Sequence, residues 1–474
     1  MSINIIIFSV MIIINTISIF SLIFIERREP STTWGWLLII TLLPGVGFVL
    51  YLCFGQDLSK RKIFNEKNII DKIKLDNIDR KEHINTINAS PRFSDLIKMN
   101  FNHCGALYTN NNSITTYING EEKFKNLLKD IENAKEFVHI EYYIFKLDNL
   151  GNTILELLKK KVNEGVEVRL LIDAMGSKSI RRKEQEYIKN LGIEFALFFP
   201  GILPLINLRI NYRNHRKIAV IDGVIGYVGG FNVGDEYVNK GKKFSFWRDT
   251  HLRIEGDAVT ELNTRFLMDW DYANKSSTTK NPKYFPSSRN VGNIGIQIVS
   301  SGPDHIEEFI KNSYLKIINN AKDHIYIQTP YLVLDEPMIE ALKISALSGV
   351  DVRIMVPYKP DHFYMPWILH ANIDLLLNSG IKFYQYNNGF IHAKTIVADS
   401  SVASIGTANF DIRSFKLNFE VNAIIYDEEM AKKYEEIFRE DEKVCIPLDK
   451  SKFNNRGVIK KFMESIIRLI SPIL

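Results

Sequence analysis

The hydrophobic and polar positions divide the 474-residue chain into an apolar N-terminal part and a long remainder in which helical and strand patterns alternate. No charged residue occurs from Ile3 to Ile25 or from Trp34 to Phe54, and each run is long enough to cross a bilayer as a helix. The first run lacks the basic start and the small-residue cleavage site of a signal peptide. A retained hairpin of two transmembrane helices is therefore predicted for residues 1–58.

The charges that flank this hairpin predict its orientation. The short loop between the two runs carries only Arg27 and Arg28 as basic residues, whereas a cluster of basic residues follows the second run: Lys60, Arg61, Lys62 and Lys67. Cytoplasmic flanks of membrane helices carry the excess of Lys and Arg. We therefore expect a multi-pass protein of the cell membrane with two spans, whose large C-terminal part lies in the cytoplasm.

The chain beyond residue 110 consists of two similar halves. Gly165, Gly192, Gly349 and Gly380 each follow a helical stretch and precede a short run rich in β-branched residues, as expected for a helix that ends at a glycine and leads into a strand. Alternating helices and strands predict an α/β sandwich in each half. The expected fold class is α/β, with two pseudo-twofold-related sandwich halves that form one catalytic body behind the transmembrane hairpin.

The predicted boundaries follow from these patterns. A linker next to the membrane or a few short helices are expected at 59–110, the first repeat at 111–290, and the second at 291–450. Residues 451–474 are expected to form an amphipathic helix with Lys460, Lys461 and Arg468 outside its apolar stripe. Such a helix suits an anionic membrane surface, and packing against the protein's own body is an equal alternative.

One motif occurs in both repeats. His215 and Lys217 are followed by Asp222, and His392 and Lys394 are followed by Asp399 at the same spacing. In each copy an Asn comes seventeen residues after the His: Asn232 in the first and Asn409 in the second. Duplication at matched spacing predicts one active centre that is assembled from two halves.

The local pattern predicts how each copy is arranged. His215 and Lys217 are two positions apart in a β-rich run, so they are expected on one face of a single strand. Asp222-Gly223 is a turn signal, and the returning strand would bring Asn232 back beside His215. The second copy predicts the same hairpin, with Asn409 beside His392.

These residue types suit chemistry at a phosphodiester. Imidazole titrates near neutrality, so one His can attack phosphorus while the other protonates the leaving alkoxide. Lys217, Lys394, Asn232 and Asn409 would bind the phosphate oxygens. Neither a metal site nor another cofactor is expected.

A nucleophilic His needs an acceptor on its second ring nitrogen, and two acids downstream of the hairpins are the candidates. They are Asp249 in Trp247-Arg248-Asp249 and Glu420 in the segment that begins at Leu417. The motif carboxylates, Asp222 and Asp399, are also candidate site residues, although their place at a turn favours a role in bracing the backbone.

Composition adds little to this picture. The chain carries 60 Lys and Arg against 55 Asp and Glu, a net charge of +5, which is too mild to indicate a nucleic-acid partner. The three cysteines are widely separated and predict neither disulfides nor a zinc site.

The doubled motif resembles that of the phospholipase D superfamily, and the segments around it resemble bacterial cardiolipin synthases. Those segments are Asn214–Lys217, Trp247–Asp249, Gly389–Lys394 and Gly406–Phe415. The resemblance implies that one phosphatidylglycerol forms a phosphatidyl-enzyme and releases glycerol, and that a second phosphatidylglycerol accepts the group to give cardiolipin. It also implies that His215 is the nucleophile and His392 the acid and base.

The sequence leaves three other functions open. A hydrolytic phospholipase D would differ only in using water as the acceptor, a nuclease of the same superfamily would need a more basic face, and a non-catalytic lipid-binding membrane protein would need neither motif. The apolar segment at 198–206 is expected to line an acyl-chain path or to be a buried loop. The oligomeric state is left open, a homo-oligomer included.

Overall fold

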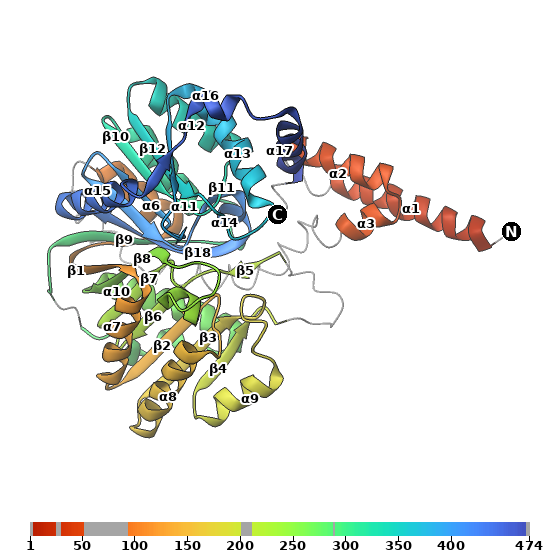
Figure 1. Cartoon of the computed structure of the whole chain (residues 1–474). Coiled ribbons are helices and arrows are strands. Elements are labelled where there is room, and N and C mark those ends of the chain that lie inside the picture. The colour runs from red at the N-terminus through yellow and green to blue at the C-terminus, as the bar shows by residue number, and fades with distance from the viewer. Residues whose placement is uncertain (1–2, 25–29, 52–92, 201–210, 288–289, 471–474) are drawn as a thin grey trace. The chain divides into compact units, whose positions relative to one another are not determined.

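The computed structural model describes residues 3–24, 30–51, 93–200, 211–287 and 290–470 (Figure 1). The chain divides into two compact units, which comprise residues 1–76 with 201–212 and residues 77–200 with 213–474. The juxtamembrane linker expected at 59–110 is described only from residue 93, and the apolar segment 198–206 only as far as residue 200. In that segment Phe198 and Phe199 are buried, and both rings pack against Phe419.

The first unit contains a pair of packed helices, α1 (Ile3–Phe24) and α2 (Pro30–Leu42), and a short helix α3 (Val46–Leu50). The Asn15 side chain of α1 donates a hydrogen bond to the carbonyl of Ile40 in α2 at 3.0 Å. The expectation of one continuous helix through the second run is wrong over the described residues. α2 ends at Leu42 and α3 begins at Val46, because Pro44 between them has no N–H and Gly45 adopts a φ of +81°. None of the described helices is both long enough and apolar enough to cross a membrane.

The second unit is the duplicated body, whose first repeat is coloured orange to green in Figure 1. Its elements are β1 (Tyr108–Asn119), α7 (Gly120–Glu132), β2 (Phe137–Tyr142), α8 (Asn149–Asn163), β3 (Glu167–Asp173), α9 (Arg182–Asn190), β4 (Glu194–Phe198), β5 (Arg213–Asn214), β6 (Ile218–Ile221), β7 (Ile225–Gly229), η3 (Asp235–Val238), β8 (Trp247–Glu255), α10 (Ala258–Asn274), η4 (Thr278–Lys280) and η5 (Pro282–Tyr284).

The second repeat follows the same plan and runs from green to blue in Figure 1. Its elements are β9 (Ile294–Ser301), α11 (Phe309–Asn320), β10 (His324–Gln328), β11 (Leu332–Val333), α12 (Glu336–Leu347), β12 (Asp351–Pro357), α13 (Met365–Leu376), η6 (Leu377–Ser379), β13 (Lys382–Tyr386), β14 (Phe390–Ile391), β15 (Thr395–Ala398), β16 (Val402–Gly406), β17 (Phe410–Asp411), α14 (Ile412–Lys416), β18 (Asn418–Tyr426), α15 (Glu428–Glu442), β19 (Cys445–Pro447), α16 (Lys450–Asn454) and α17 (Val458–Ile470).

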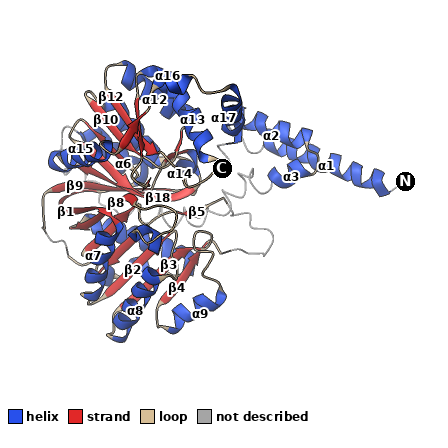
Figure 2. Cartoon of the chain, in the orientation of Figure 1, coloured by secondary structure: helices blue, strands red, loops and turns tan. Residues whose placement is uncertain are grey.

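Each repeat builds a mixed sheet, and β1 is shared between the two. The order in the first sheet is β4-β3-β2-β6-β7-β8-β1, and the order in the second is β1-β9-β18-β16-β15-β10-β12-β13-β19. Neighbouring helix-linked strands such as β2 and β3 are parallel, whereas the hairpin strands are antiparallel. Figure 2 shows the strands of each half between helices, which agrees with the expected α/β sandwiches.

Alternation along the strands explains why both faces of a sheet are covered. In β2, Val138 and Ile140 join the apolar core under α7 and α8, while His139 points to the other face and stacks on Phe266 of α10, with ring centroids 4.6 Å apart. Successive side chains of a strand face opposite ways. His139 is therefore a core histidine, and its Nδ1 lies 2.8 Å from the Asn263 side chain.

Several elements agree with the sequence pattern. Gly165, Gly192, Gly349 and Gly380 all have φ between +82° and +97°, the backbone of a helix C-terminus, and a strand follows each. The predicted hairpins are also confirmed, since β6 pairs with β7 and β15 pairs with β16, both antiparallel.

A helix occupies the end of the segment 59–110, for which a linker or a few short helices were expected. This helix is α6 (Ser94–Cys104), whose Leu96 and Ile97 are buried in the core of the second repeat. Its Asn100 donates to Gln297 of β9 at 3.1 Å. The end of the linker is therefore part of the folded body.

The C-terminal helix α17 turns a polar side toward α13 and leaves an apolar side exposed. Glu464 is 4% exposed and pairs with Arg456 at 2.9 Å and with His370 of α13 at 3.3 Å. In contrast, Ile459 and Phe462 are 80% and 63% exposed. Ile467 of α17 packs with Met365 and Ile368 of α13, so the side of α17 that faces the body carries both a buried polar pair and an apolar contact.

Candidate active site

Each motif lies in a break between two strands, and the break is where one repeat pairs with the other. His215–Lys217 lie between β5 and β6, and β5 pairs in parallel with β18 of the second repeat. His392–Lys394 lie between β14 and β15, and β14 pairs in parallel with β8 of the first repeat. The backbone N–H of His215 donates to Phe419 at 2.9 Å, and that of His392 donates to Arg248 at 2.6 Å.

The expectation that each His and Lys share one continuous strand is therefore wrong in this detail. The chain leaves its own sheet to pair with the other repeat and returns to its own sheet after the Lys. The exchange fastens each motif to the opposite half, which a pattern within one repeat cannot reveal.

The two histidines line one cavity. Its volume is about 390 Å³, and both imidazoles are almost buried, with His215 9% and His392 7% exposed. The polar residues of the wall are Tyr143, Arg213, His215, Asn232, Tyr237, Trp247, Tyr331, Asp361, His362, Tyr364, His392, Asn409, Asp411, Arg413 and Asn418. The wall thus includes both histidines and both motif asparagines.

A carboxylate from the opposite repeat holds each histidine. The Nδ1 of His215 lies 3.0 Å from Glu420 of β18, and the Nδ1 of His392 lies 2.6 Å from Asp249 of β8. Both carboxylates are fully buried. The sequence identified these two acids, and the structure shows that they are exchanged between the repeats.

The electrostatics favour neutral imidazoles beside ionised carboxylates. Burial lowers the pKa of His215 to about 4 and also lowers that of His392. Burial alone would raise the pKa of Glu420 and Asp249, but the imidazole and lysine next to each hold it below its usual value. A neutral ring that donates Nδ1–H to a carboxylate keeps the lone pair on Nε2, which is the nucleophilic atom.

The two motif lysines lie beside the histidines. Lys217 donates through Nζ to the carbonyl of His215 at 2.5 Å, and Lys394 donates to the carbonyl of His392. Both are fully buried, and burial lowers their pKa to about 7 and about 8. An anionic phosphate would favour their charged form.

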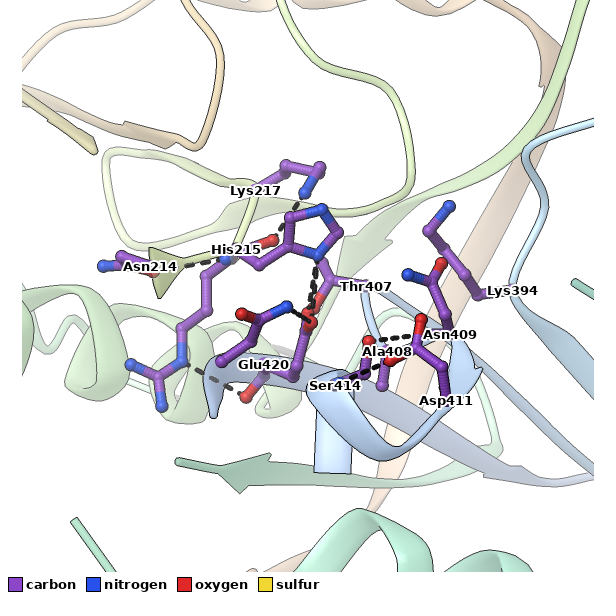
Figure 3. Close-up of polar contacts among 12 residues, drawn as sticks. Asn214, His215, Lys217, Lys394, Thr407, Ala408, Asn409, Asp411, Ser414 and Glu420 are labelled. Carbon is purple, nitrogen blue, oxygen red and sulfur yellow. Dashed lines mark hydrogen bonds and ion pairs between the residues drawn. The ribbon is translucent and has the colours of Figure 1, made fainter. Parts of the chain in front are cut away.

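Figure 3 shows that residues from both repeats meet at His215, with Lys217 on one side and with Asn409 and Lys394 of the second repeat on the other. In the first repeat the Asn232 side-chain oxygen accepts from the backbone N–H of Ile144 at 3.1 Å, and its amide nitrogen donates to the Tyr237 hydroxyl at 3.3 Å, which leaves its second N–H as a donor. Donors from two chain halves that converge on one cavity suit an anion at its centre.

The motif aspartates brace the fold outside the cavity wall. Asp222 accepts hydrogen bonds from three backbone N–H groups, those of residues 135–137 at the start of β2, at 2.8 to 2.9 Å. Asp399 accepts from residues 322–324 at the start of β10 at 2.8 to 3.1 Å. Both occupy the left-handed region, with φ of +52° and +51°, at the hairpin turn. These contacts give them a positioning role.

Several residues of the cavity wall were not identified as site residues from the sequence. Arg213 and Arg413 lie near the motifs in sequence, at positions that carried no duplicated signal. Tyr331 and Asp361 come from the second repeat, far from either motif, and the Tyr331 hydroxyl donates to Asp361 at 2.5 Å. No spacing rule would have found these two, because loops of different lengths deliver them.

Gly230 shows why one position beside the site lacks a side chain. A Cβ at Gly230 would lie 1.9 Å from the Asp249 carboxylate oxygen. Any larger residue there would displace the carboxylate that holds His392.

Comparison with known protein families agrees with this site. A family model described as "Cardiolipin synthase, PLD-like domain" matches residues 127–270 and 314–442, one segment in each repeat. A second model, "Phospholipase_D-nuclease N-terminal", matches residues 13–56.

Relatives of known name cover almost the entire chain. The chain is 52% identical to a cardiolipin synthase of Clostridium perfringens (strain SM101 / Type A) over 95% of this chain and 96% of the relative. It is 47% identical to a cardiolipin synthase of Staphylococcus aureus (strain Mu50 / ATCC 700699) over 99% and 98%.

A solved structure shares the fold. The phosphatidylserine synthase of Haemophilus influenzae Rd KW20 matches 76% of this chain and 95% of its own, with a TM-score of 0.55 at 14% identity. Together with the paired histidine motifs and the extent of the family match, the high identity to named relatives assigns the chain: it belongs to the cardiolipin synthases, a family of phosphatidyl transferases with the phospholipase D-like domain.

Proposed function

We propose that this enzyme transfers the phosphatidyl group of one phosphatidylglycerol to a second phosphatidylglycerol through a phosphohistidine on His215. One observation carries the proposal: both histidines line a single cavity, and each has its Nδ1 held by a buried carboxylate. This arrangement supplies two Nε2 atoms to one phosphorus. The names of the relatives support cardiolipin as the product and a phospholipid as the substrate.

In the first step, Nε2 of His215 attacks the phosphorus of the donor lipid. The bond from phosphorus to the glycerol headgroup oxygen breaks, and Nε2 of His392 gives that oxygen its proton. Burial disfavours the protonated form of His392, whereas the negative charge of the bound lipid would favour it. Lys217, Lys394 and the two motif asparagines would hold the phosphate oxygens.

In the second step, His392 takes the proton from a headgroup hydroxyl of the acceptor lipid, whose oxygen attacks phosphorus. The bond between phosphorus and His215 breaks, and cardiolipin is released with both histidines in their starting forms. The overall reaction converts two phosphatidylglycerol molecules into one cardiolipin and one glycerol. All the residues that take part in these two steps belong to this one chain.

The proposed reaction is tested by incubating the purified full-length protein in detergent micelles with phosphatidylglycerol as the only lipid. We expect cardiolipin and glycerol to appear in equal amounts, because each transfer releases one headgroup. Phosphatidic acid in place of cardiolipin would show that water is the acceptor and that the enzyme is a hydrolase. The double variant that lacks both histidines, His215→Ala with His392→Ala, is the control for contaminating activity.

We further propose that the N-terminal part anchors the enzyme as a two-span hairpin with the catalytic body in the cytoplasm. The uncharged runs, the basic residues after position 59 and the match to the N-terminal family model support this location. The helix α17 offers a second lipid contact, since Ile459 and Phe462 are exposed next to Lys460 and Lys461. Its Ile467 packs with Met365 and Ile368, which line the active-site cavity.

The proposed cytoplasmic location predicts that a protease outside the cell cannot reach the catalytic body. A tag inserted after residue 60 should be protected from a protease added outside intact cells and should be cleaved once the membrane is permeabilised. Cleavage in intact cells would contradict the cytoplasmic location.

A further inference from the structure

The proposed reaction brings two phosphates into one site. The donor phosphate reacts between the histidines, whereas the acceptor keeps its own phosphate, which lies one glycerol unit away from the attacking hydroxyl. A hydrolase has no use for a second phosphate site. A synthase that selects a phospholipid acceptor needs cations at that distance from the histidines.

Two arginines outside the duplicated motifs line the same cavity as His215 and His392. Arg213 lies on β5, two residues before His215, and Arg413 lies on α14, four residues after Asn409. One arginine therefore comes from each repeat. Burial and then the positive charge of Arg213 lower the pKa of Arg413, so the two guanidinium groups are close enough to repel.

The arginine pair breaks the pseudo-twofold symmetry of the site. At the position that corresponds to Arg213 in the second motif stands Phe390, and at the position that corresponds to Arg413 in the first repeat stands Glu236. The histidines, lysines and asparagines are duplicated, but neither arginine has an arginine at the corresponding position of the other repeat. A donor and an acceptor lipid differ in what they do, so their two phosphates need such an asymmetry.

The carboxylates around the pair attract the arginines, Asp173 acting on Arg213 and Asp411 on Arg413, and they also make contacts of their own. Asp411 accepts the backbone N–H of Ser414 at 2.6 Å and caps α14. Asp173 accepts the backbone N–H of Asn214 at 2.8 Å, and Asp361 accepts the Tyr331 hydroxyl. Each of these acids fixes a loop of the cavity wall.

We propose that Arg213 and Arg413, whose charges are only partly balanced by Asp173 and Asp411, bind the phosphate of the acceptor phosphatidylglycerol and so select a phospholipid as the acceptor. The inference rests on the proposed transfer reaction. The planar guanidinium group donates paired N–H bonds that match phosphate oxygens. Two guanidinium groups line the cavity of the histidines but do not belong to the duplicated motifs. They therefore suit the acceptor phosphate better than the donor phosphate that reacts.

The test compares two acceptors with the same donor. Cardiolipin formation from phosphatidylglycerol uses a phospholipid acceptor, whereas incorporation of labelled glycerol into phosphatidylglycerol uses an acceptor that has no phosphate. We expect Arg213→Gln and Arg413→Gln each to lower the ratio of cardiolipin synthesis to glycerol incorporation by about 10-fold or more, the scale of a lost charged hydrogen bond. Melting temperatures measured alongside would identify a variant that fails to fold.

The matched control is Arg182→Gln, which removes an arginine that is exposed on α9. Its ratio should equal that of the unmodified enzyme. If both reactions fall by the same factor in a folded Arg213→Gln or Arg413→Gln protein, or if neither falls, the acceptor assignment is wrong. If the unmodified enzyme incorporates glycerol but makes no cardiolipin, the proposed function itself fails, whatever the arginines do.

Discussion

Replacement of His392 by alanine is expected to give an enzyme that releases a single stoichiometric burst of nitrophenol from phosphatidyl-p-nitrophenol and then stops, whereas His215→Ala gives no burst. Nitrophenolate leaves without a proton, so the first step no longer needs the acid. His215 can then form the phosphohistidine alone. The second step still needs a base to deprotonate the acceptor, and without His392 the intermediate accumulates.

With phosphatidylglycerol as the donor, both variants should be nearly inactive. We expect His392→Ala to cost about 100- to 10,000-fold, the usual scale of general acid and base catalysis. His215→Ala should cost about 10,000-fold or more, because a missing nucleophile removes the covalent route. Cardiolipin synthesis measured by lipid chromatography gives both factors.

The labelled intermediate decides which histidine is the nucleophile. Lipid label should remain on the His392→Ala protein after acid-free denaturation and should be absent from His215→Ala. Label on the His215→Ala protein, together with no burst from His392→Ala, would exchange the two roles. The near symmetry of the site makes this a real alternative, since burial lowers the pKa of both imidazoles.

The sequence predicted the parts of the site that repeat. The hairpins, the glycines at helix ends and the residues His215, His392, Asn232 and Asn409 at one centre all follow from local patterns at matched spacing. Such patterns are readable because they depend on a strand period of two and on a turn.

The features that the sequence did not predict all depend on contacts between the repeats. The strand break at His215 occurs because β5 pairs with β18, about 200 residues further along the chain. Likewise, the sequence left open whether residues 94–104 form a linker or a short helix, and α6 belongs to the folded body because Leu96 and Ile97 complete the core of the second repeat. Contacts between distant segments determine both features, and the hydrophobic pattern within one segment does not predict them.

The exchange of carboxylates between the repeats has the same origin and leads to the second large effect. Glu420→Gln should abolish the nitrophenol burst, although Glu420 lies in the repeat of the other histidine. A glutamine amide can donate to Nδ1 of His215 and would then place the ring proton on Nε2, the atom that must attack. Loss of the correct tautomer costs about 10,000-fold in a serine protease triad with the same geometry.

Asp249→Asn, in contrast to Glu420→Gln, should keep the nitrophenol burst and slow the turnover. Asp249 holds His392, so the burst should remain while turnover with phosphatidylglycerol falls by a factor of about 100 or more. The control is Glu435→Gln, which removes another buried carboxylate that lies 2.6 Å from a histidine, His324, outside the cavity wall. That variant should keep both the burst and the turnover.

The two variants together test the exchange itself. If each acid served the histidine of its own repeat, Asp249→Asn would remove the burst and Glu420→Gln would spare it. The structure gives the reverse order, because the strands that carry the acids, β8 and β18, each pair with the strand that leads into the opposite motif. A phosphohistidine on His215 therefore depends on a carboxylate from the second repeat, and neither repeat can complete a nucleophile without the other.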